Sequence, residues 1–518
     1  MEELISRKNA RTVLFLGEGN FSFSTSLTGL WDQEIKSSKH NNDEVYNNSL
    51  MSLNDIYSTC YERHPVSSLA KGNIDLLKQK GVNVLLGIDG TSNFKEDIEG
   101  RFQCKFFDKV IFMFPHVGGK MKIKKNRDLL RDFATNIINY LNPENKDAQV
   151  VIALCGGQGG TPFDPIRRAE SDTWQVIKML SYGGLQLVSI GMFDIEKCGN
   201  GLPESYCSYG YRGINKGFRS DNGVVHVFEA SRNPICSIAR NASPRINYCQ
   251  SRSIRDVKNE YMRRKMNQVL DKRSLIGKFL EHFVTFITSL NNVKVSLSIK
   301  LKNKVDFDIL APEFKKLEIL HAHKNFTQIV TIEVGMEEDF TMDFTKCPVK
   351  TTILVKHCPN ALKDVLVEEF NSGIISKSES LLTFDLTTLS LNYFSRNCAI
   401  QKAEFEDVSW QQLWSNKKSI YPPKYSHCLS FWVQKEYFHK DSNIFDQTSL
   451  AIILWCCGYD SVVSCELVDI YEEENRISNT YKVEYESHIF PLSPNLAFEL
   501  QTKSIGETLK HLFNAEIR

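Results

Sequence analysis

Two glycines flank Glu18 directly after the apolar run Val13–Leu16. Four apolar residues followed by Gly-x-Gly predict a buried strand that enters a tight turn before a helix. Because such a turn has few side chains, its backbone can approach a ligand closely, and the first N–H groups of the helix point toward it. We therefore predict that Gly17, Gly19 and the following Asn20 contact a nucleotide-type cofactor.

Acidic residues follow two further apolar segments. Glu62 stands at the end of residues 56–61, where its carboxylate could accept two hydrogen bonds from a ribose diol. Asp89 follows residues 82–88, where it could bind an adenine amine. Ligands of doubly wound sheets bind outside the carboxyl ends of the strands, so these acids are expected at one site. For either acid alone, a helix cap or a loop turn is the alternative interpretation.

Two acids with a Gly-x-Gly turn fit S-adenosylmethionine better than a dinucleotide. A dinucleotide fingerprint needs a third glycine near the position of Ser22. The sequence has no GxxxxGK[ST] motif, so a P-loop phosphate site is excluded. Phe114, at the end of the apolar segment 109–114, completes the predicted cofactor contacts.

Pro115 and His116 follow that segment, at the position where a methyl acceptor would lie. His116 could accept the N3 proton of a uracil ring, since the two acidities are close enough for a histidine base to help. Catalysis would otherwise be mainly positioning. The alternative is that His116 is a loop residue that packs against the cofactor site.

Cations gather beyond these two residues. Five cations occur within eight residues of the same loop and could hold a phosphate backbone: Lys120, Lys122, Lys124, Lys125 and Arg127. Arg167 and Arg168 follow the glycine-rich loop 156–162 and could bind phosphate on the same rim. A solvated loop is the alternative for the first group. The nearby Trp174 is expected in the core because the apolar spacing of its helix faces inward.

The elements that position these residues alternate along residues 1–230. Short apolar strands are expected at residues 13–16, 56–61, 82–88, 109–114, 149–155, 185–193 and 223–228, separated by helical stretches. This alternation predicts an α/β Rossmann-like domain with a parallel sheet between helices. The polar insert at residues 32–54 is expected to be a mobile surface loop.

Two further regions follow. Residues 231–415 are expected to contain a basic linker helix, with eight Lys and Arg against three Asp and Glu in residues 251–273, and an α+β middle region without a chemical motif. That helix could be solvated or could contact RNA. Residues 420–518 predict a separate α+β domain with strands near 428–433, 462–471 and 479–485, and helices after Ser449 and near 496–513. The order β-α-β-β-α-β is ferredoxin-like.

Composition limits the classes of protein. The 63 Lys and Arg nearly balance the 62 Asp and Glu, so any RNA-binding surface must be a local patch. No window approaches the length of a membrane-spanning helix, and residues 1–11 do not resemble a secretory signal. The fourteen cysteines contain no CxxC pair, so we expect free thiols, no bound metal and a cytoplasmic, or else nucleolar, location.

The N-terminal motifs resemble those of the 25S ribosomal RNA uridine-N3-methyltransferases, over roughly residues 12–190. The matching segments are LFLGEGNFSFS, TCYER, GIDGT, FDKVIFMFPHVGG and KNRDLLRDF. The resemblance implies S-adenosylmethionine as cofactor and N3 of a uridine as methyl acceptor. It also implies that Gly17, Gly19, Glu62 and Asp89 occupy cofactor positions of that family.

The C-terminal segment resembles the ferredoxin-fold anticodon-binding domain of phenylalanyl-tRNA synthetases. The matching segments are YPPKYSHCLSFWV, SVVSCELVDIYEEE, SNTYKVEYES and NAEIR. The resemblance implies tRNA as partner, although the same fold also mediates protein contacts. Five aromatic residues could stack bases, although alternation places about half of such residues in the core: Phe431, Trp432, Tyr471, Tyr481 and Tyr485.

These patterns together predict an S-adenosylmethionine-dependent RNA methyltransferase that acts at uridine N3 of rRNA or tRNA, with a C-terminal RNA-docking domain. Two alternatives remain open at this point. One is a non-enzymatic RNA-binding protein that retains the fold as a scaffold. The other is a protein whose C-terminal domain associates with a synthetase subunit. Sequence motifs expected around an aminoacylation site of a class II synthetase are absent.

Overall fold

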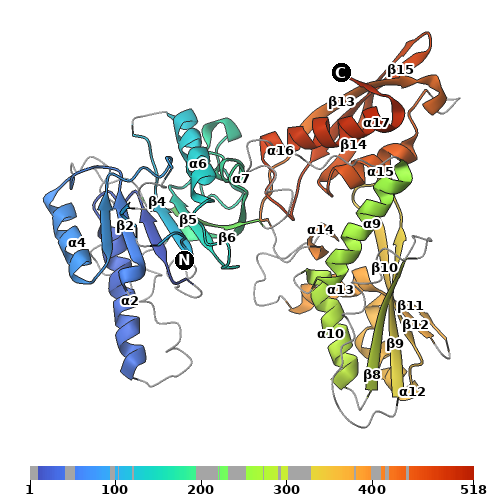
Figure 1. Cartoon of the computed structure of the whole chain (residues 1–518), viewed down its shortest axis with the longest axis horizontal. Helices are drawn as coiled ribbons and strands as arrows, with labels where there is room; N and C mark the ends of the chain where they lie inside the picture. Colours follow the sequence, from blue (N-terminus) through green and yellow to red (C-terminus); the bar gives the residue numbers. More distant parts are fainter. Residues whose placement is uncertain are drawn as a thin grey trace. The chain divides into compact units, whose positions relative to one another are not determined.

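The computed structural model divides into two compact units (Figure 1). It describes residues 10–40, 53–93, 100–102, 104–118, 122–193, 220, 222–231, 253–271, 274–289, 293–301, 328–378, 381–397, 410–414, 419–438 and 443–518. The N-terminal unit comprises Met1–Pro244, Ser419–Pro423 and Phe490–Leu496, and the C-terminal unit comprises the remaining residues. The domain boundaries expected near residues 230 and 415 stay predictions.

A seven-stranded sheet forms the centre of the N-terminal unit. Its strands are β1 (Val13–Leu16), β2 (Ile56–Cys60), β3 (Asn83–Leu86), β4 (Lys109–Met113), β5 (Gln149–Leu154), β6 (Leu185–Phe193) and β7 (Gly223–Ala230). The spatial order is β3-β2-β1-β4-β5-β7-β6. Neighbouring strands from β3 to β5 are parallel, whereas β7 is antiparallel to both β5 and β6. All seven predicted strands are confirmed to within about two residues at their ends.

Helices cover both faces of this sheet. They are α2 (Ser22–His40), α4 (Ser68–Gln79), α6 (Ile123–Ile137) and α7 (Val176–Ser181). Apolar residues of α2 and α4 pack in one buried cluster, and those of α6 and α7 pack in the cluster on the opposite face. Trp174 is 5% exposed within the second cluster, so its predicted core position is confirmed.

The predicted surface loop at residues 32–54 is wrong at both ends. Helix α2 continues to His40, and a short 3₁₀ turn at Leu53–Asp55 precedes β2. The helix extends because Leu27 and Trp31, one turn apart, are both fully buried and anchor it on the sheet. Residues 41–52 of this insert lie outside the described residues, and the expectation of a surface loop there stays a prediction.

The middle region contains a second sheet, of five strands, as the α+β interpretation predicts. Its strands are β8 (Val293–Leu301), β9 (Gln328–Glu338), β10 (Val349–Lys356), β11 (Ile374–Lys377) and β12 (Leu381–Asp385), in the order β11-β12-β10-β9-β8. Only the pair β8–β9 is parallel among the described pairings. The associated helices are α9 (Ile254–Leu270), α10 (Leu275–Ser289), α12 (Asn360–Glu369), α13 (Leu386–Asn397) and α14 (Trp410–Leu413).

The last sheet has four antiparallel strands in the order β14-β15-β13-β16. The elements follow the chain as β13 (Tyr425–Gln434), α15 (Gln447–Cys457), β14 (Val462–Glu473), β15 (Arg476–Tyr485), a helical run and β16 (Glu516–Ile517). The helical run consists of α16 (Pro494–Glu499), a π-helical segment (Leu500–Gly506) and α17 (Glu507–Phe513). The element order β-α-β-β-α-β agrees with the order expected from the sequence.

Part of the charge of the predicted basic helix is buried in the C-terminal unit. Lys265 of α9 has no exposed side-chain surface, and its Nζ lies 2.7 Å from the Asp460 carboxylate. The Arg264 guanidinium lies 4.6 Å from the ring centroid of Tyr459. Both the solvated helix and the RNA-contacting helix are therefore wrong descriptions of Lys265, because packing removes it from solvent, whereas Arg264 is partly exposed.

Candidate functional site

The carboxyl ends of the parallel strands converge as predicted. Gly17, directly after β1, has φ +67°, and a Cβ atom there would lie 2.7 Å from a ring carbon of Phe112 on β4. At Gly90, beyond β3, a Cβ atom would lie 2.4 Å from a methyl carbon of Leu16. Both positions exclude a side chain, and at Gly17 the left-handed backbone also favours glycine. The backbone therefore carries no side chain at these two positions, where β1 and β3 end.

Glu18, which the sequence interpretation passed over, is the buried acid of this turn. Its Oε2 accepts hydrogen bonds from the Ser24 N–H (3.3 Å) and hydroxyl (3.2 Å) at the start of α2. Burial raises the pKa of the Glu18 carboxyl to about 7, against the lowering effect of the Ser24 bonds. The sequence could have indicated this burial, because Glu18 lies between two glycines in a turn that directly follows a buried strand.

Asn20 and Gly19 complete the turn. The Asn20 Oδ1 accepts a hydrogen bond from the Ser22 N–H at 3.0 Å, and its backbone carbonyl accepts one from Asn73 Nδ2 at 2.8 Å. Asn20 is 8% exposed, so its side chain serves the start of helix α2. Gly19 is partly exposed beside it. Backbone groups of this turn, more than the Asn20 side chain, are thus placed to contact a ligand.

Glu62 and Asp89 lie on neighbouring strand ends. The Gly87 N–H donates to the Glu62 carbonyl at 2.9 Å, which joins the ends of β2 and β3. The Glu62 carboxylate accepts a hydrogen bond from the Cys60 thiol at 2.9 Å. Asp89 Oδ1 accepts bonds from the N–H (2.9 Å) and hydroxyl (2.7 Å) of Thr91, so one oxygen of Asp89 stabilises a loop turn. Both side chains are partly exposed.

Phe114, Pro115 and His116 follow β4. Phe114 has φ +47° and its ring packs edge-on against Phe193 of β6 at a centroid distance of 5.2 Å. Pro115 is buried, whereas His116 is exposed. This packing directs Phe114 toward the β6 and β7 end of the sheet rather than toward the ends of β2 and β3.

The hydrogen bonding of His116 defines its chemistry. Its Nδ1 accepts a hydrogen bond from the Gly118 N–H at 2.7 Å, so the neutral ring carries its proton on Nε2. Partial burial, and then the charge of Lys122, lowers the pKa of the imidazole. A neutral His116 with Nε2–H is a hydrogen-bond donor at its exposed edge. The predicted role as a proton acceptor would require the ring to break its bond to Gly118.

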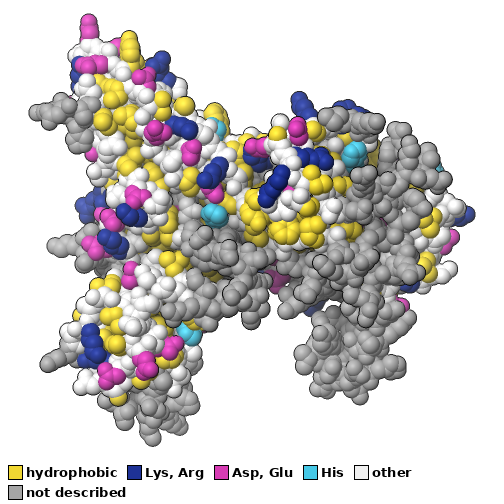
Figure 2. Space-filling model, turned by 180° about the vertical axis from the view of Figure 1, so that it is seen from behind, with side chains coloured by type: hydrophobic (Ala, Val, Ile, Leu, Met, Phe, Trp, Pro, Cys, Tyr) yellow, Lys and Arg dark blue, Asp and Glu magenta, His cyan; other side chains and the backbone are white. Residues whose placement is uncertain are grey.

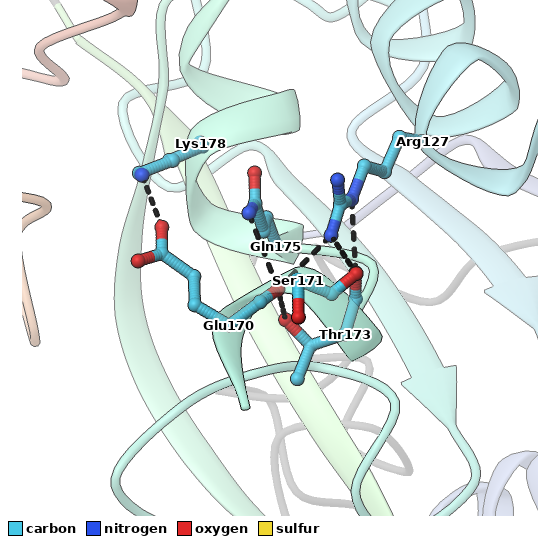
Figure 3. A network of polar contacts seen from close by, with 6 residues as sticks. All are labelled: Arg127, Glu170, Ser171, Thr173, Gln175 and Lys178. Carbon is cyan, nitrogen blue, oxygen red and sulfur yellow. Dashed lines mark hydrogen bonds and ion pairs between the residues drawn. The ribbon is translucent and has the colours of Figure 1, made fainter. Parts of the chain in front are cut away.

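Exposed cations lie beside His116, and one predicted cation is used internally. Lys122, Lys124 and Lys125 are exposed at the start of α6, whereas Lys120 lies outside the described residues. Arg127 binds backbone carbonyls of the loop that precedes α7 (Figure 3). Because this guanidinium holds the loop, Arg127 is placed as a structural residue and not as a phosphate ligand.

The contacts of Arg127 are numerous. Its Nε donates to the Thr173 carbonyl at 2.9 Å, and its Nη2 donates to the carbonyls of Glu170 at 2.9 Å and Ser171 at 2.8 Å. An ion pair between Lys178 and the Glu170 carboxylate ties the same loop to α7 (Figure 3). Arg127 therefore holds Glu170, Ser171 and Thr173 in place, and Glu170 in turn holds Lys178.

Arg167 and Arg168 are exposed beyond the glycine-rich loop 156–162, and their binding of phosphate stays a prediction. That loop is organised by Asp164, which the sequence interpretation missed: its two carboxylate oxygens accept from the N–H groups of Gly157 (2.9 Å) and Thr161 (2.8 Å). By accepting these two hydrogen bonds, Asp164 fixes the conformation of the loop that precedes both arginines.

A buried histidine lies under the same loop. His226 of β7 has no exposed surface, and a Cβ at Gly159 would lie 2.8 Å from its Nε2. Burial lowers its pKa to about 4, against the opposing effect of Asp164. Neither residue stands in a recognisable sequence motif, because the contact joins β7 to a loop more than sixty positions earlier in the chain.

The aromatic residues predicted for base stacking mostly belong to the core. Phe431, Tyr481 and Tyr485 are at most 1% exposed. Trp432 is 6% exposed, with the Arg476 guanidinium 4.5 Å from its ring centroid. Only Tyr471 is open, at 56% exposed. Base stacking by the first three is wrong, because the face of the sheet that they occupy is covered by helices.

Fold and site together define a class. The order 3-2-1-4-5-6 of dinucleotide-binding sheets is modified here by β7, which is inserted antiparallel between β5 and β6. This sheet, with a glycine turn after β1 and acids after β2 and β3, is a methyltransferase-like Rossmann fold.

Comparison with known proteins agrees with this class. A family model described as rRNA (uridine-N3-)-methyltransferase BTM5-like matches residues 14–199. The chain is similar to human ferredoxin-fold anticodon-binding domain-containing protein 1, with 32% identity over 226 residues. Its mouse homolog is 32% identical over 221 residues. Each match covers 43% of this chain and 31% of the relative, so the matched segment spans about a third of the length of those proteins.

Among solved structures, TrmN from Thermus thermophilus aligns with 44% of this chain and 47% of its own, at 11% identity and a TM-score of 0.23. The fold assignment rests on the strand order rather than on this alignment. In the described residues, no group of three or more His, Cys, Asp or Glu is arranged to hold a metal ion, and no helix is long and apolar enough to cross a membrane.

Proposed function

We propose that the N-terminal unit is an S-adenosylmethionine-dependent RNA methyltransferase that acts at N3 of a uridine. The observation that carries the proposal is the side-chain-free turn at Gly17, next to the acids after β2 and β3, within a segment that matches a uridine-N3 methyltransferase family model. The sequence resemblance described above supports the same activity.

The residues present fit the cofactor. A Cβ at Gly17 would clash with the Phe112 ring and the left-handed backbone also favours glycine, so the turn has no side chain at this position and its backbone would contact the cofactor. Glu62 would accept hydrogen bonds from the ribose hydroxyls, and Asp89 would bind the adenine amine through the carboxylate oxygen that Thr91 does not use. S-adenosylmethionine, when bound, supplies an electrophilic methyl group.

His116 and the cations beside it would position the acceptor. The Nε2–H of a neutral His116 would donate to a carbonyl oxygen next to N3, and so favour the anionic ring that forms when N3 loses its proton. The exposed Lys122, Lys124 and Lys125 would bind phosphates of the RNA on either side of the target base. Arg167 and Arg168 would extend this contact along the rim.

For the last hundred residues we propose a ferredoxin-like domain, on the basis of the order β-α-β-β-α-β and the sheet order β14-β15-β13-β16. Its predicted role is to dock structured RNA, and both rRNA and tRNA are candidate substrates of the whole protein. The description of the family model over residues 14–199 motivates rRNA, whereas the anticodon-binding resemblance motivates tRNA.

Cofactor binding to the purified full chain tests this proposal. We expect S-adenosylmethionine at a hundredfold excess over its dissociation constant to stabilise the N-terminal unit by about 2.7 kcal/mol, visible as a higher melting temperature. Glu62→Ala and Asp89→Ala should each reduce the shift. Glu144→Ala, which removes an exposed acid from the same unit, is the matched control and should leave it unchanged.

The acceptor is tested separately, by transfer of labelled methyl groups to unmodified rRNA and tRNA transcripts. Label at N3 of a uridine is the expected result. If the cofactor stabilises neither the wild type nor the control, the catalytic proposal fails, and a scaffold that only binds partners becomes the better description.

A further inference from the structure

One strand edge in the C-terminal unit has an unusual surface. Strand β14 lies at the end of its sheet, and its register with β15 shifts between Val462 and Ser464 and again between Leu467 and Asp469. From Asp469 to Glu473 the pairing is regular. No other described strand pairs with the outer side of these residues, so it is a short, regular strand edge, and Figure 1 shows the β14–β15 hairpin projecting from its sheet domain.

Large apolar side chains are exposed on this strand. Val468 is 58% exposed, Ile470 39% and Tyr471 56%, and the three are almost consecutive. Scattered apolar residues are normal on a surface, but three on one projecting edge form a candidate contact. In Figure 2 the upper-left part of the molecule shows yellow apolar side chains beside magenta acidic ones.

The charge around these apolar residues is negative. Five exposed acids lie on the strand and its turn: Glu466, Asp469, Glu472, Glu473 and Glu474. Glu472 pairs with Lys435 at 2.6 Å and Glu473 with Arg476 at 2.8 Å, so part of this charge is compensated. Residues 420–518 as a whole hold fourteen acids against eight lysines and arginines.

This charge selects the kind of partner. RNA binds proteins largely through cations that neutralise its phosphates, so the segment from Asp469 to Glu474 would repel it. A second copy of the chain would bring the same acids against each other across the edge, which is also unfavourable. A basic polypeptide satisfies both the acids and the open strand edge.

We propose that the β14 edge, defined as residues Asp469–Glu474, binds an extended segment of a protein partner that carries both Lys or Arg and apolar residues on each of its two faces. The segment adds to the sheet as a further strand, with backbone hydrogen bonds to β14. Because Ile470 and Tyr471 are consecutive in regular pairing, they lie on opposite faces of the sheet. Apolar side chains on the two faces of the added strand cover these two residues, and its cations pair with Asp469 and Glu474. This inference is independent of the proposed methyltransferase activity.

The test uses the full-length chain and a short fluorescent peptide with the repeat Lys-Lys-Val-Val, which places both residue types on each face of a strand, with binding measured by anisotropy. We expect binding that weakens as salt increases, and no binding of the corresponding Glu and Val peptide. Asp469→Lys with Glu474→Lys should weaken binding about tenfold or more. Glu368→Lys with Glu369→Lys, two exposed acids of α12 in the same unit, is the matched control and should leave affinity unchanged.

A second variant and a second probe distinguish the alternatives. Ile470→Ser with Tyr471→Ser keeps all the acids and should also weaken peptide binding, because the apolar contacts with the peptide are lost. A single-stranded RNA oligonucleotide is the competing probe. The proposal is overturned if the peptide does not bind the wild type, if the control weakens binding as much as the β14 variant, or if the serine variant reduces RNA affinity instead.

Discussion

The two units of this protein contain similar runs of cations and use them in opposite ways. At the start of α6, Lys122, Lys124 and Lys125 are exposed beside His116. On α9, Lys265 is fully buried against Asp460. Both runs would contribute equally to a charge count along the sequence. A basic segment is therefore evidence for a nucleic-acid surface only after its side chains are shown to reach solvent.

The acidic residues of the two units also differ in their burial and location. Glu18 is buried in the N-terminal unit, and Glu62 and Asp89 lie at strand ends where a ligand could meet them. On the outer strand of the C-terminal sheet, Asp469 and Glu474 are exposed. The first arrangement is suited to binding a small polar molecule, and the second is suited to a basic surface.

Breaking the buried pair in α9 should have the largest effect. Lys265→Ala leaves the carboxylate of Asp460 buried without its cation, so the free energy of unfolding of the C-terminal unit should fall by about 3–5 kcal/mol. Urea unfolding followed by tryptophan fluorescence measures this loss. Lys265→Met combined with Asp460→Asn removes both charges and should recover most of it.

Arg255→Ala is the control for that experiment, because it removes an exposed cation from the same helix. Its effect should stay within about 0.5 kcal/mol. Equal effects of Lys265→Ala and Arg255→Ala would contradict the distinction between buried and exposed cations.

Glu18 should make the stability of the N-terminal unit depend on pH. Its folded pKa of about 7 lies above the ordinary value of 4.5, so between these pH values the unfolded chain releases a proton that the folded chain keeps. The free energy of unfolding should therefore fall as pH rises through this window, by up to about 3 kcal/mol. Comparing Glu18→Gln with the wild type at pH 4 and pH 8 isolates the contribution.

In that comparison the advantage of Glu18→Gln over the wild type should be larger at pH 8 than at pH 4. A difference that does not change with pH would show that Glu18 ionises normally. Glu144→Gln, an exposed acid, serves as the matched control and should show no such change.

The glycine turn should tolerate substitution less than a helical glycine does. Gly17→Ala forces an L-residue into a left-handed conformation and displaces Phe112, so it should cost about 1–2 kcal/mol or more. Gly72→Ala in α4 meets no atom within 4 Å and should gain about 0.5–1 kcal/mol through helix propensity. Thermal unfolding of both variants measures the contrast, and similar losses would contradict it.

The smallest predicted effect concerns the rim cations. Lys124→Ala with Lys125→Ala should leave stability unchanged and reduce the slope of log affinity against log salt by about 1.4 for single-stranded RNA, about 0.7 for each phosphate contact. Lys71→Ala with Lys78→Ala on α4 is the matched control. An unchanged slope in the first variant would remove these lysines from the RNA surface.

Arg127 is the predicted RNA-binding cation for which we do not expect a phosphate contact. Because its guanidinium holds carbonyls of Glu170 and Thr173, Arg127→Ala should loosen the loop and increase its cleavage by protease more than it alters the salt slope. The sequence placed Arg127 with the lysines because only its charge was visible.

Much of the fold was predictable because it depends on local patterns. All seven strands of the first sheet and the order β-α-β-β-α-β at the end follow from apolar runs separated by turn residues. The length of α2 was missed, because its polar residues obscured the burial of Leu27 and Trp31. The burial of Lys265 was missed because it depends on Asp460, nearly two hundred positions later.

The sequence by itself determined which residues end the parallel strands. An apolar run and a glycine turn specify where a strand stops, so Gly17, Glu62 and Asp89 could be assigned to one edge before any contact was known. Strand periodicity is a short-range property, and it survives without knowledge of the partner strands.

Only the tertiary structure decided what those and other side chains are able to do. It placed Glu18 under the turn, bound Nδ1 of His116 to Gly118 and used Arg127 to hold a loop. The exposure and protonation of an ionisable group depend on neighbours that are distant in the chain. The sequence shows which residues can carry charge, but the packing of the folded molecule decides whether a charged group can reach a ligand.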